Sequence, residues 1–484
     1  MHIGYNFKEF YEGGITVMLD TIVSSINNAL YSYILIVLLV GGGIFFMFRT
    51  KFVQFRLFGE QIRAVTEKPR DKGGVSSFQA LMVSTASRVG TGNIIGVSTA
   101  LCLGGYGSVF WMWVIAIIGG ASAFIESTLA QIYKKKDENG ESYGGPAYYI
   151  EAALHSRPLA LAFSVFLILT YGFGFNMLAS YNLQSTFSVY GFYNPAYTPW
   201  IIGFVLAAIV GYCLMGGGTR IIKVTSLLVP FMGIAYILVA LFVVVINAQM
   251  LPSIFSRIFT EAFDFEAIFG GFSGSCVMYG IKRGLFSNEA GVGSAPNASA
   301  SAEVSHPAKQ GLVQILSVFI DTLLVCTATA FLCMCSGIEP TEAISGAPYV
   351  QAALGKTLGA FGPAFITIAM ILFAFTTLLG NLYYVDKCLI YMLRKTPGKT
   401  FMRIYHIIAS LVIFVGAGLS ADLLWNIADI TMGGMTLINM PVILILSKYA
   451  LRALKNYDEQ RKDGKEPVFR ARDIGLPHEV DCWK

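Results

Sequence analysis

The sequence predicts an all-α polytopic membrane protein with about eleven transmembrane helices. Of its 484 residues, 55% are apolar and 13% are charged, and the mean hydropathy is +0.63. Soluble domains carry about 25% charged residues, so a water-soluble body of this size would lack polar surface. Apolar runs of about 20 residues, long enough to span a bilayer as a helix, recur along the chain.

The apolar runs form one entry helix followed by two sets of five spans. The entry helix is expected near 30–48. The first set is expected near 76–103, 108–133, 159–187, 198–216 and 224–247, and the second near 267–302, 308–336, 361–393, 403–419 and 423–447. The chain then divides into an N-terminal segment with the entry helix and a cytoplasmic loop (1–75), a first repeat (76–247), a second repeat with an outer loop (248–447) and a cytoplasmic tail (448–484).

Lysine and arginine test this count, because short cytoplasmic loops collect them. Of the 34 Lys and Arg residues, 27 fall on the side that the count makes cytoplasmic and three on the other side. The remaining four, Arg88, Lys282, Arg283 and Lys387, lie within spans. This asymmetry favours eleven spans, with the N-terminus outside and the C-terminus cytoplasmic. It also accounts for the net charge of +5 without a nucleic-acid partner.

Three further segments are not expected to span the membrane. Residues 144–156 predict a short surface helix, and 337–362 predict a long outer loop with helical pieces. The segment 455–484 is charged and contains proline, which is typical of a solvated and partly disordered end.

In each of the two sets, one glycine motif interrupts the first span. SRVGTG at 87–92 matches NEAGVG at 288–293 with a shift of 201 residues, so that Gly90 meets Gly291 and Arg88 meets Glu289. Because five is odd, the second set enters the membrane from the opposite side. This is an inverted repeat, and paired broken helices in its two halves are typical of secondary transporters.

The glycine motifs have a physical reading as helix breaks. Lipid cannot satisfy freed amides and carbonyls, so a broken helix survives only where protein lines a cavity. There the amides at a half-helix N-terminus can hold a carboxylate and the carbonyls at a C-terminus can hold a cation. A nucleotide-binding loop is excluded, because no strand precedes Gly90. The stretch FGGFSGS, 269–275, is an alternative second break. With the break at 288–293, Lys282 and Arg283 must face a watery outer vestibule.

These motifs resemble the alanine or glycine:cation symporter family (amino acid carrier proteins). The resemblance is carried by SSFQALMVSTASRVGTGNIIGVSTALCLGG (76–105), by GLFSNEAGVGSAPNASASAEVSHP (284–307) and by FWMWVIAIIGGASAFIESTLAQIYKKKDENGESYGGPAYYI (110–150), and it covers most of 30–450. It implies a LeuT-like 5+5 inverted repeat with an extra N-terminal helix and two discontinuous helices. It also implies that the chain is not an enzyme but a plasma-membrane symporter importing a small neutral amino acid, alanine or glycine, with sodium and sometimes protons. No organic cofactor is expected, and no pattern indicates an oligomeric state.

The first break, VGTGN at 89–93, resembles the corresponding break of LeuT-type sodium symporters. By that resemblance the carbonyls of Ala86, Val89 and Phe373 and the hydroxyls of Thr376 and Thr377 ligate sodium. The chemistry agrees, because hard cations take oxygen ligands. The alternative for the two threonines is ordinary hydrogen bonding to their own helix.

The same resemblance predicts the substrate site. The amides of Thr91 and Gly92, beside Gly90, open a half-helix and are expected to hold the substrate carboxylate. Asn93 is expected to orient the substrate or to line a second cation position. The remaining candidates are Asn288, Ala290 and Gly291 in the second break, for the substrate ammonium, and Phe173 and Asn176 in the span 159–187.

Four ionisable residues within the spans leave functions open. Arg88, Glu126, Glu289 and Asp321 are costly in a membrane unless they are paired or hydrated. Pairing of Arg88 with Glu289, a gating role, helix bridging and proton carriage all stay open. Proton carriage would make the protein a proton-coupled amino acid carrier, which is the first alternative. An ion channel is a weaker alternative, because filter repeats and charge rings are absent from the sequence.

Overall fold

The computed structural model describes residues 25–27, 29–69, 73–138, 140–271, 275–476 and 480–483. Helices make up nearly all regular structure in these residues, apart from one antiparallel hairpin of β1 (Lys135–Lys136) and β2 (Ser142–Tyr143). The prediction of an all-α protein is confirmed.

Eleven helical spans cross the bundle within the described residues. In chain order they are η1–α2 (Leu30–Ile34, Leu35–Arg49); α5 with η2 and α6 (Ser77–Arg88, Gly92–Gly96, Val97–Gly104); α7 (Gly107–Ile132); α9 with η3 and α10 (Arg157–Leu167, Ile168–Gly174, Phe175–Ser185); α11 (Thr198–Leu214); α12 (Gly217–Ile246); α15 with α16 (Cys276–Asn288, Pro296–Ser299); α17 with η6 and α18 (Pro307–Val318, Phe319–Cys326, Thr327–Met334); α20 (Phe361–Leu393); α21 (Lys399–Gly416); and α22 (Ala421–Lys462). Seven are helices long and apolar enough to cross a membrane without interruption. The others are η1–α2, the 17-residue α11 and the two broken spans.

Shorter helices connect the spans. They are α3 (Val53–Arg56), α4 (Phe58–Thr66), α8 (Pro146–Leu154), η4 (Ala248–Met250), α13 (Leu251–Ala262), α14 (Phe265–Gly270), η7 (Glu342–Ile344), α19 (Ala347–Leu358) and η8 (Ala471–Ile474). The short helix expected at 144–156 is α8, but none of its residues is exposed, because Tyr148 and Tyr149 pack against α20 and α22, so its expected surface position is wrong. Helices η7 and α19 are the helical pieces expected at 337–362.

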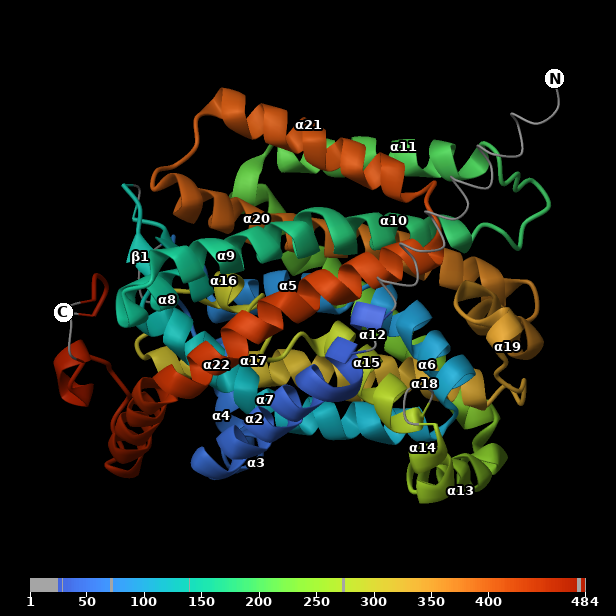
Figure 1. Ribbon diagram of the computed structural model, residues 1–484, viewed down its shortest axis with the longest axis horizontal. Coiled ribbons are helices and arrows are strands. Elements are labelled where there is room, and N and C mark those ends of the chain that lie inside the picture. Colours follow the sequence, from blue (N-terminus) through green and yellow to red (C-terminus); the bar gives the residue numbers. More distant parts are fainter. Residues whose placement is uncertain are drawn as a thin grey trace.

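The bundle has two distinct ends (Figure 1). One end carries β1, α8 and the end of α22, and we call it the tail face. The opposite end carries α6, α13 and α19, and we call it the vestibule face. Between them, α11 and α21 pack against each other at the periphery, beside α10 and α20.

The broken spans lie in the interior of the bundle. Helix α5 packs against α12 and α20, and α15 packs against α7. Residues Ala80 to Arg88 of α5 and all four residues of α16 are buried. A broken helix is stable at this depth because protein, rather than lipid, surrounds its freed backbone groups.

Local sequence explains where the first broken span begins. The Ser76 hydroxyl accepts a hydrogen bond from the Gln79 amide at 3.1 Å, and the Gln79 side chain accepts one from the Ser76 amide at 2.9 Å. This capping box satisfies two helix-terminal donors and starts α5 one residue later, at Ser77.

Several boundaries differ from the expectation. Helix α12 begins at Gly217 rather than near 224, and α22 continues to Lys462 rather than ending near 447. Hydropathy detects only the apolar part of a helix, and both extensions are polar. The alternative break at 269–275 includes residues 272–274, which lie outside the described residues; α15 starts just after it, capped by Ser275.

The end of the chain is anchored by a few buried side chains. Phe469, Val480 and Trp483 are 2%, 6% and 3% exposed, respectively. Many described residues of 455–484, including 462–466, are exposed as expected, but the segment is not wholly solvated. The physical reason is that its few large apolar side chains are gathered on the tail face, where they cover one another and the end of α7.

Candidate substrate and cation site

The first break frees two backbone carbonyls. The Gly90 amide donates to the Asn93 side-chain oxygen at 2.7 Å, and the Asn93 amide donates to the Gly90 carbonyl at 3.1 Å. In a continuous helix these two amides would donate to the carbonyls of Ala86 and Val89. The carbonyls of Ala86 and Val89 therefore lose their helical donors. They are the two carbonyls that the sequence proposed as sodium ligands in this helix.

The second break uses left-handed backbone. Glu289, Gly291 and Gly293 have φ angles of 52°, 85° and 94°, which glycine adopts readily and glutamate does not. The short α16 resumes three residues later at Pro296. Both predicted helix breaks are therefore present.

The candidate residues Asn288, Ala290 and Gly291 lie on the side of the second break that contacts α7 and α22. The Asn288 side chain accepts the Ala290 amide at 3.0 Å, and the Gly291 carbonyl accepts from Asn439 of α22 at 2.9 Å. Asn439 also donates to Glu126 of α7 at 3.0 Å. The structure does not bring these three candidates to the cavity between the two breaks. Their hydrogen bonds instead stabilise the backbone of the second break on its α7 and α22 side.

A small cavity lies between the two breaks. Its volume is about 20 Å³, room for about one water molecule. Its lining comes from both broken spans, from α10 and from α20: Ser87, Arg88, Gly90, Thr91, Gly92, Phe175, Leu178, Ala179, Phe286, Glu289 and Thr377. The structure thus brings the candidates Gly90, Thr91, Gly92 and Thr377 together at one place. An amino acid needs more room, so the described state is closed around the site.

Arg88 and Glu289 give this cavity one positive and one negative group. Arg88 donates to Gln314 at 3.0 Å, and its Nε and Nη2 atoms have no hydrogen-bond partner among the described residues. Glu289 accepts from the hydroxyls of Ser294 at 2.6 Å and Ser87 at 3.4 Å. Across the described ranges, no ion pair of 4 Å or less involves Arg88. Both groups therefore face the cavity without a direct contact to each other.

The two threonines of α20 point in different directions. The Thr377 hydroxyl has no hydrogen-bond partner within the described chain, and it would lie 2.1 Å from a methyl group added at Gly90. The Thr376 hydroxyl donates to the carbonyls of Leu372 at 2.9 Å and Phe373 at 3.2 Å. Thr377 thus faces the first break, whereas Thr376 makes the helix hydrogen bonds that the sequence left as its alternative.

The Asn93 side chain is held by Asp321 of η6, in the span of α17, η6 and α18. Its side-chain amide donates to the Asp321 carboxylate at 2.6 Å and to the Ser287 hydroxyl at 3.1 Å. Asp321 also accepts from Ser287 and Thr322, both at 2.7 Å. Asp321 therefore bridges the first broken span to α15, and both ends of the Asn93 side chain are occupied by protein.

The candidates of the span 157–185 are only partly at the site. Phe173 lies on the outer surface of the bundle and is 36% exposed, so it does not face the cavity. Asn176 is buried and accepts from Asn381 of α20 at 2.9 Å. The neighbouring Phe175 lines the cavity instead, with its ring centroid 4.6 Å from that of Phe286.

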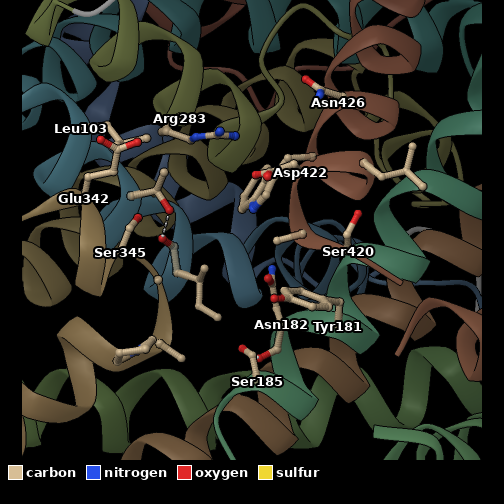
Figure 2. A pocket seen from close by; sticks show the side chains of 18 of the residues that line it. Leu103, Tyr181, Asn182, Ser185, Arg283, Glu342, Ser345, Ser420, Asp422 and Asn426 are labelled. Atoms are coloured by element: carbon tan, nitrogen blue, oxygen red, sulfur yellow. Dashed lines mark hydrogen bonds between the residues drawn. The ribbon is translucent and has the colours of Figure 1, made fainter. Parts of the chain in front are cut away.

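A vestibule of about 870 Å³ opens above the cavity, on the vestibule face. Figure 2 shows Arg283, Asn182, Asp422 and Glu342 directed into it from different elements. Lys282 and Arg283, which were expected to face a watery outer vestibule, both line it, but they are only 8% and 6% exposed and both pair with Asp429, at 2.8 and 3.7 Å.

Two contacts connect the vestibule with the cavity. Asn182 lines the vestibule and donates to the Thr91 hydroxyl at 3.0 Å. Trp425, also a lining residue, lies 4.8 Å from the Phe286 ring, with the Arg283 guanidinium 3.9 Å above it. The rings of Phe175, Phe286 and Trp425, which we call the aromatic lid, therefore separate the vestibule from the cavity.

The chain is similar to known proteins along most of its length. A model of the sodium:alanine symporter family matches residues 16–471. The chain is 42% identical over 466 residues to the amino-acid carrier protein AlsT of Bacillus subtilis (strain 168), covering 96% of this chain and 98% of AlsT. It is also 42% identical over 469 residues to the probable sodium/glutamine symporter GlnT of the same strain, covering 96% of each. The chain belongs to the sodium:alanine symporter family.

The fold agrees with this family assignment. The structure is similar to that of MhsT in complex with L-phenylalanine, with a TM-score of 0.53 and 16% identity over 84% of this chain and 93% of MhsT. The LeuT-like 5+5 architecture with an extra N-terminal helix is thereby confirmed. As a member of the sodium:alanine symporter family, the chain is a membrane transporter that moves an amino acid together with a cation.

Sequence reasoning missed several residues of this symporter's cavity and lid. Phe175, Phe286 and Trp425 are aromatic residues in apolar spans, where most aromatic side chains pack in the core or face lipid. Phe175 follows Gly174 in TYGFGFNM (170–177), so the glycines beside it were its one signal. A weak signal existed for Phe286, because it precedes the second break by three residues on the α15 side. Asn182 has a weak signal as well, since it is a polar residue within a long apolar span.

Proposed function

We propose that this protein is a sodium-coupled symporter that imports a small neutral amino acid, alanine or glycine. The observation that carries the proposal is the meeting of three oxygen groups at the first break. The carbonyls of Ala86 and Val89 have lost their helical donors, and the buried Thr377 hydroxyl beside Gly90 has no protein partner among the described residues. Unpaired buried oxygens are costly, and a bound cation would satisfy them.

The proposed sodium site consists of these three groups together with α20. The carbonyl of Phe373 and the hydroxyl of Thr376 complete the ligand set that the family resemblance implies, and in the described state the Thr376 hydroxyl points away from the first break, so it would have to turn toward the cation. The Thr376 hydroxyl donates its hydrogen to its own helix, which leaves its oxygen lone pairs available to a cation.

The proposed substrate site is the cavity between the breaks. The amides of Thr91 and Gly92 stand in the first turn of a half-helix, where no intrahelical acceptor exists, and they would hold the substrate carboxylate. Glu289 would face the substrate ammonium, and Arg88 balances its charge. A cavity with one cation and one anion suits a zwitterion of zero net charge.

The aromatic lid supports a small substrate. A methyl group added at Gly92 would lie 2.8 Å from the Phe286 ring, so this ring already packs against the backbone of the first break. Opening the lid enough for alanine or glycine requires less displacement than opening it for a glutamine side chain. The substrate named for the relative GlnT is therefore the less favourable candidate here.

We infer the orientation from charge. The tail face carries most Lys and Arg residues, and such residues collect on the cytoplasmic side. The vestibule then opens outside the cell, the C-terminus is cytoplasmic, and the membrane is the plasma membrane.

Uptake of radiolabelled alanine into proteoliposomes tests the proposal. Sodium, potassium and proton gradients are compared, with unlabelled glycine, serine, glutamine and D-alanine as competitors. Sodium-driven uptake with competition by alanine and glycine is expected. Uptake in a proton gradient alone would move the coupling to Glu289 or its neighbours, and substrate-independent ion flux would favour a channel. The absence of uptake in every gradient would refute the symporter.

A further inference from the structure

The chain turns back on itself after α22 and covers part of the tail face (Figure 1). We call residues 463–476 and 480–483 the tail strap. The turn is made at Gly464, which has a φ of 73°. The strap then hydrogen-bonds along the segment between α16 and α17: Ser305 donates to the Pro467 carbonyl at 2.8 Å, and the Phe469 amide donates to the Ser305 carbonyl at 3.0 Å.

The strap ends in a buried aromatic contact with α7. The Trp483 indole donates to the Gln131 carbonyl at 2.7 Å, and its ring lies 5.2 Å from the Lys134 ammonium. The Phe469 ring packs edge-on against Trp483 at 5.4 Å. Trp483 is 3% exposed, so the strap is anchored by a desolvated side chain and not only by rim charges.

Gln131 and Lys134, which contact Trp483, hold the tail-face end of the second broken span. The Gln131 side chain donates to the carbonyls of Ser299 at 2.6 Å and Ala302 at 2.9 Å. The Lys134 ammonium donates to the same Ala302 carbonyl at 2.8 Å. Gln131 and Lys134 therefore satisfy the C-terminal carbonyls of α16, and the strap packs against both residues.

The inner end of the first broken span meets the second at this place. Val75, two residues before α5, forms a parallel bridge with Ala302, and the Glu303 amide donates to the Val75 carbonyl at 2.9 Å. A movement that opens the site toward the tail face must separate these two inner ends. The strap lies across one of them and is linked through it to the other.

We propose that the tail strap is a conformational latch. It holds together the tail-face ends of the two broken spans, which form the inner gate, and so restrains the step in which the site opens toward the tail face. This proposal rests on the proposed transport function, because it assigns the strap to one half of the transport cycle. Release of the Trp483 anchor frees the Gln131–Lys134 pair and lets the inner half-helices α5 and α16 separate.

Local hydrogen exchange measured by mass spectrometry tests the latch on the full-length protein. In Trp483→Ala, exchange of peptides covering 77–88 and 296–306 is expected to be about tenfold faster or more, because a buried hydrogen bond and an aromatic anchor are lost. Exchange in α21, which lies away from the strap, is expected to be unchanged. The matched control is Arg472→Ala, since Arg472 is 74% exposed and pairs only with its neighbour Asp473 in the described structure.

A second variant keeps the test decisive if Trp483→Ala does not fold. Trp483→Phe retains a ring against Phe469 but cannot donate to Gln131, so an increase of about threefold is expected in the same two peptides. Unchanged exchange in 77–88 and 296–306, or equal acceleration in α21, would overturn the latch, because the strap would then be inert or merely stabilising. If the unmodified protein fails to transport alanine, the proposed function fails while the exchange data still decide about the strap.

Discussion

Gly90 is the position where close helix packing meets the proposed cation site, and its substitution separates the two. In Gly90→Ala, the added methyl group would lie 2.1 Å from Thr377 Oγ1, 3.2 Å from its Cβ and 3.3 Å from its Cγ2. Ordinary contacts begin at about 3.4 Å. The overlap with Oγ1 forces α5 and α20 apart, and overpacking of this kind costs about 1–3 kcal/mol.

The variant is expected to lose both thermal stability and sodium affinity. Displacement of α20 moves Thr377 away from the carbonyls of Ala86 and Val89, so the half-saturating sodium concentration is expected to rise about tenfold or more, which corresponds to ~1.4 kcal/mol. Thermal unfolding against sodium concentration and alanine uptake in proteoliposomes measure the two effects. Gly233→Ala in α12 is the matched control, since no atom lies within 4 Å of the added methyl group.

The double variant Gly90→Ala with Thr377→Ala distinguishes the two causes. Removal of Oγ1 and Cγ2 leaves only the 3.2 Å contact to Cβ, so thermal stability is expected to recover toward that of the unmodified protein. Sodium-dependent uptake is expected to stay low, because the hydroxyl ligand is also gone. If Gly90→Ala behaves like Gly233→Ala in both assays, or if the double variant restores sodium dependence, the assignment of Thr377 to the sodium site is refuted.

Three further predictions concern the cation site, the lid and the tail face. Thr377→Val is expected to weaken the sodium dependence of uptake without lowering stability, because the buried hydroxyl has no protein partner in the described chain. The control is Thr225→Val, because the Thr225 hydroxyl donates to its own helix. An unchanged sodium response in Thr377→Val would count against the proposed site. Phe286→Leu is expected to increase competition by glutamine relative to glycine, measured in alanine uptake, because it removes ring atoms from the lid over Gly92; unchanged selectivity would contradict this. Burial, with a smaller effect of a neighbouring lysine, lowers the pKa of His306 from 6.5 to about 3, so the unfolded chain takes up a proton at a higher pH than the folded protein. Thermal stability should then fall as the pH drops from 6.5 toward 3, and it should fall less in His306→Asn; identical pH profiles would exclude this cause.

Much of the fold could be predicted because a membrane-spanning helix requires a long apolar run of residues. The expected span at 361–393 coincides with α20, and both helix breaks lie within the glycine motifs. The domain boundaries proposed from the sequence stay a prediction. Hydropathy identifies only the apolar part of a helix. It therefore found the spans but did not indicate their polar extensions. The turn-back of the chain after Lys462 depends on a few large side chains far apart in sequence, which no periodic pattern reveals.

The candidate site was predictable only where it depends on the backbone. The resemblance of VGTGN to LeuT-type breaks implied the carbonyls of Ala86 and Val89, and in the structure both carbonyls lack their helical donors. Side-chain direction is different, because neighbouring residues on one helix point about 100° apart. This explains why Phe173 lies outside while Phe175 lines the cavity, and why Thr376 and Thr377 have different partners. Three π-helical segments, η2, η3 and η6, add to this, since each shifts the facing of the residues that follow it.

The two sides of the closed cavity are unequal, and this inequality predicts which side opens first from the described state. Toward the vestibule the aromatic lid and the Asn182–Thr91 hydrogen bond close the cavity, and Arg283 beside Trp425 already borders a space of about 870 Å³. Rotation of the lid side chains exposes them to a region large enough for water, which can replace the hydrogen bond that is lost. Toward the tail face, opening must break the two Gln131 hydrogen bonds to the end of α16, which lie in a buried environment where unmade bonds are costly. The described state is therefore closer to opening at the vestibule, and the tail side is the one that needs binding of the cation and the substrate to shift its equilibrium.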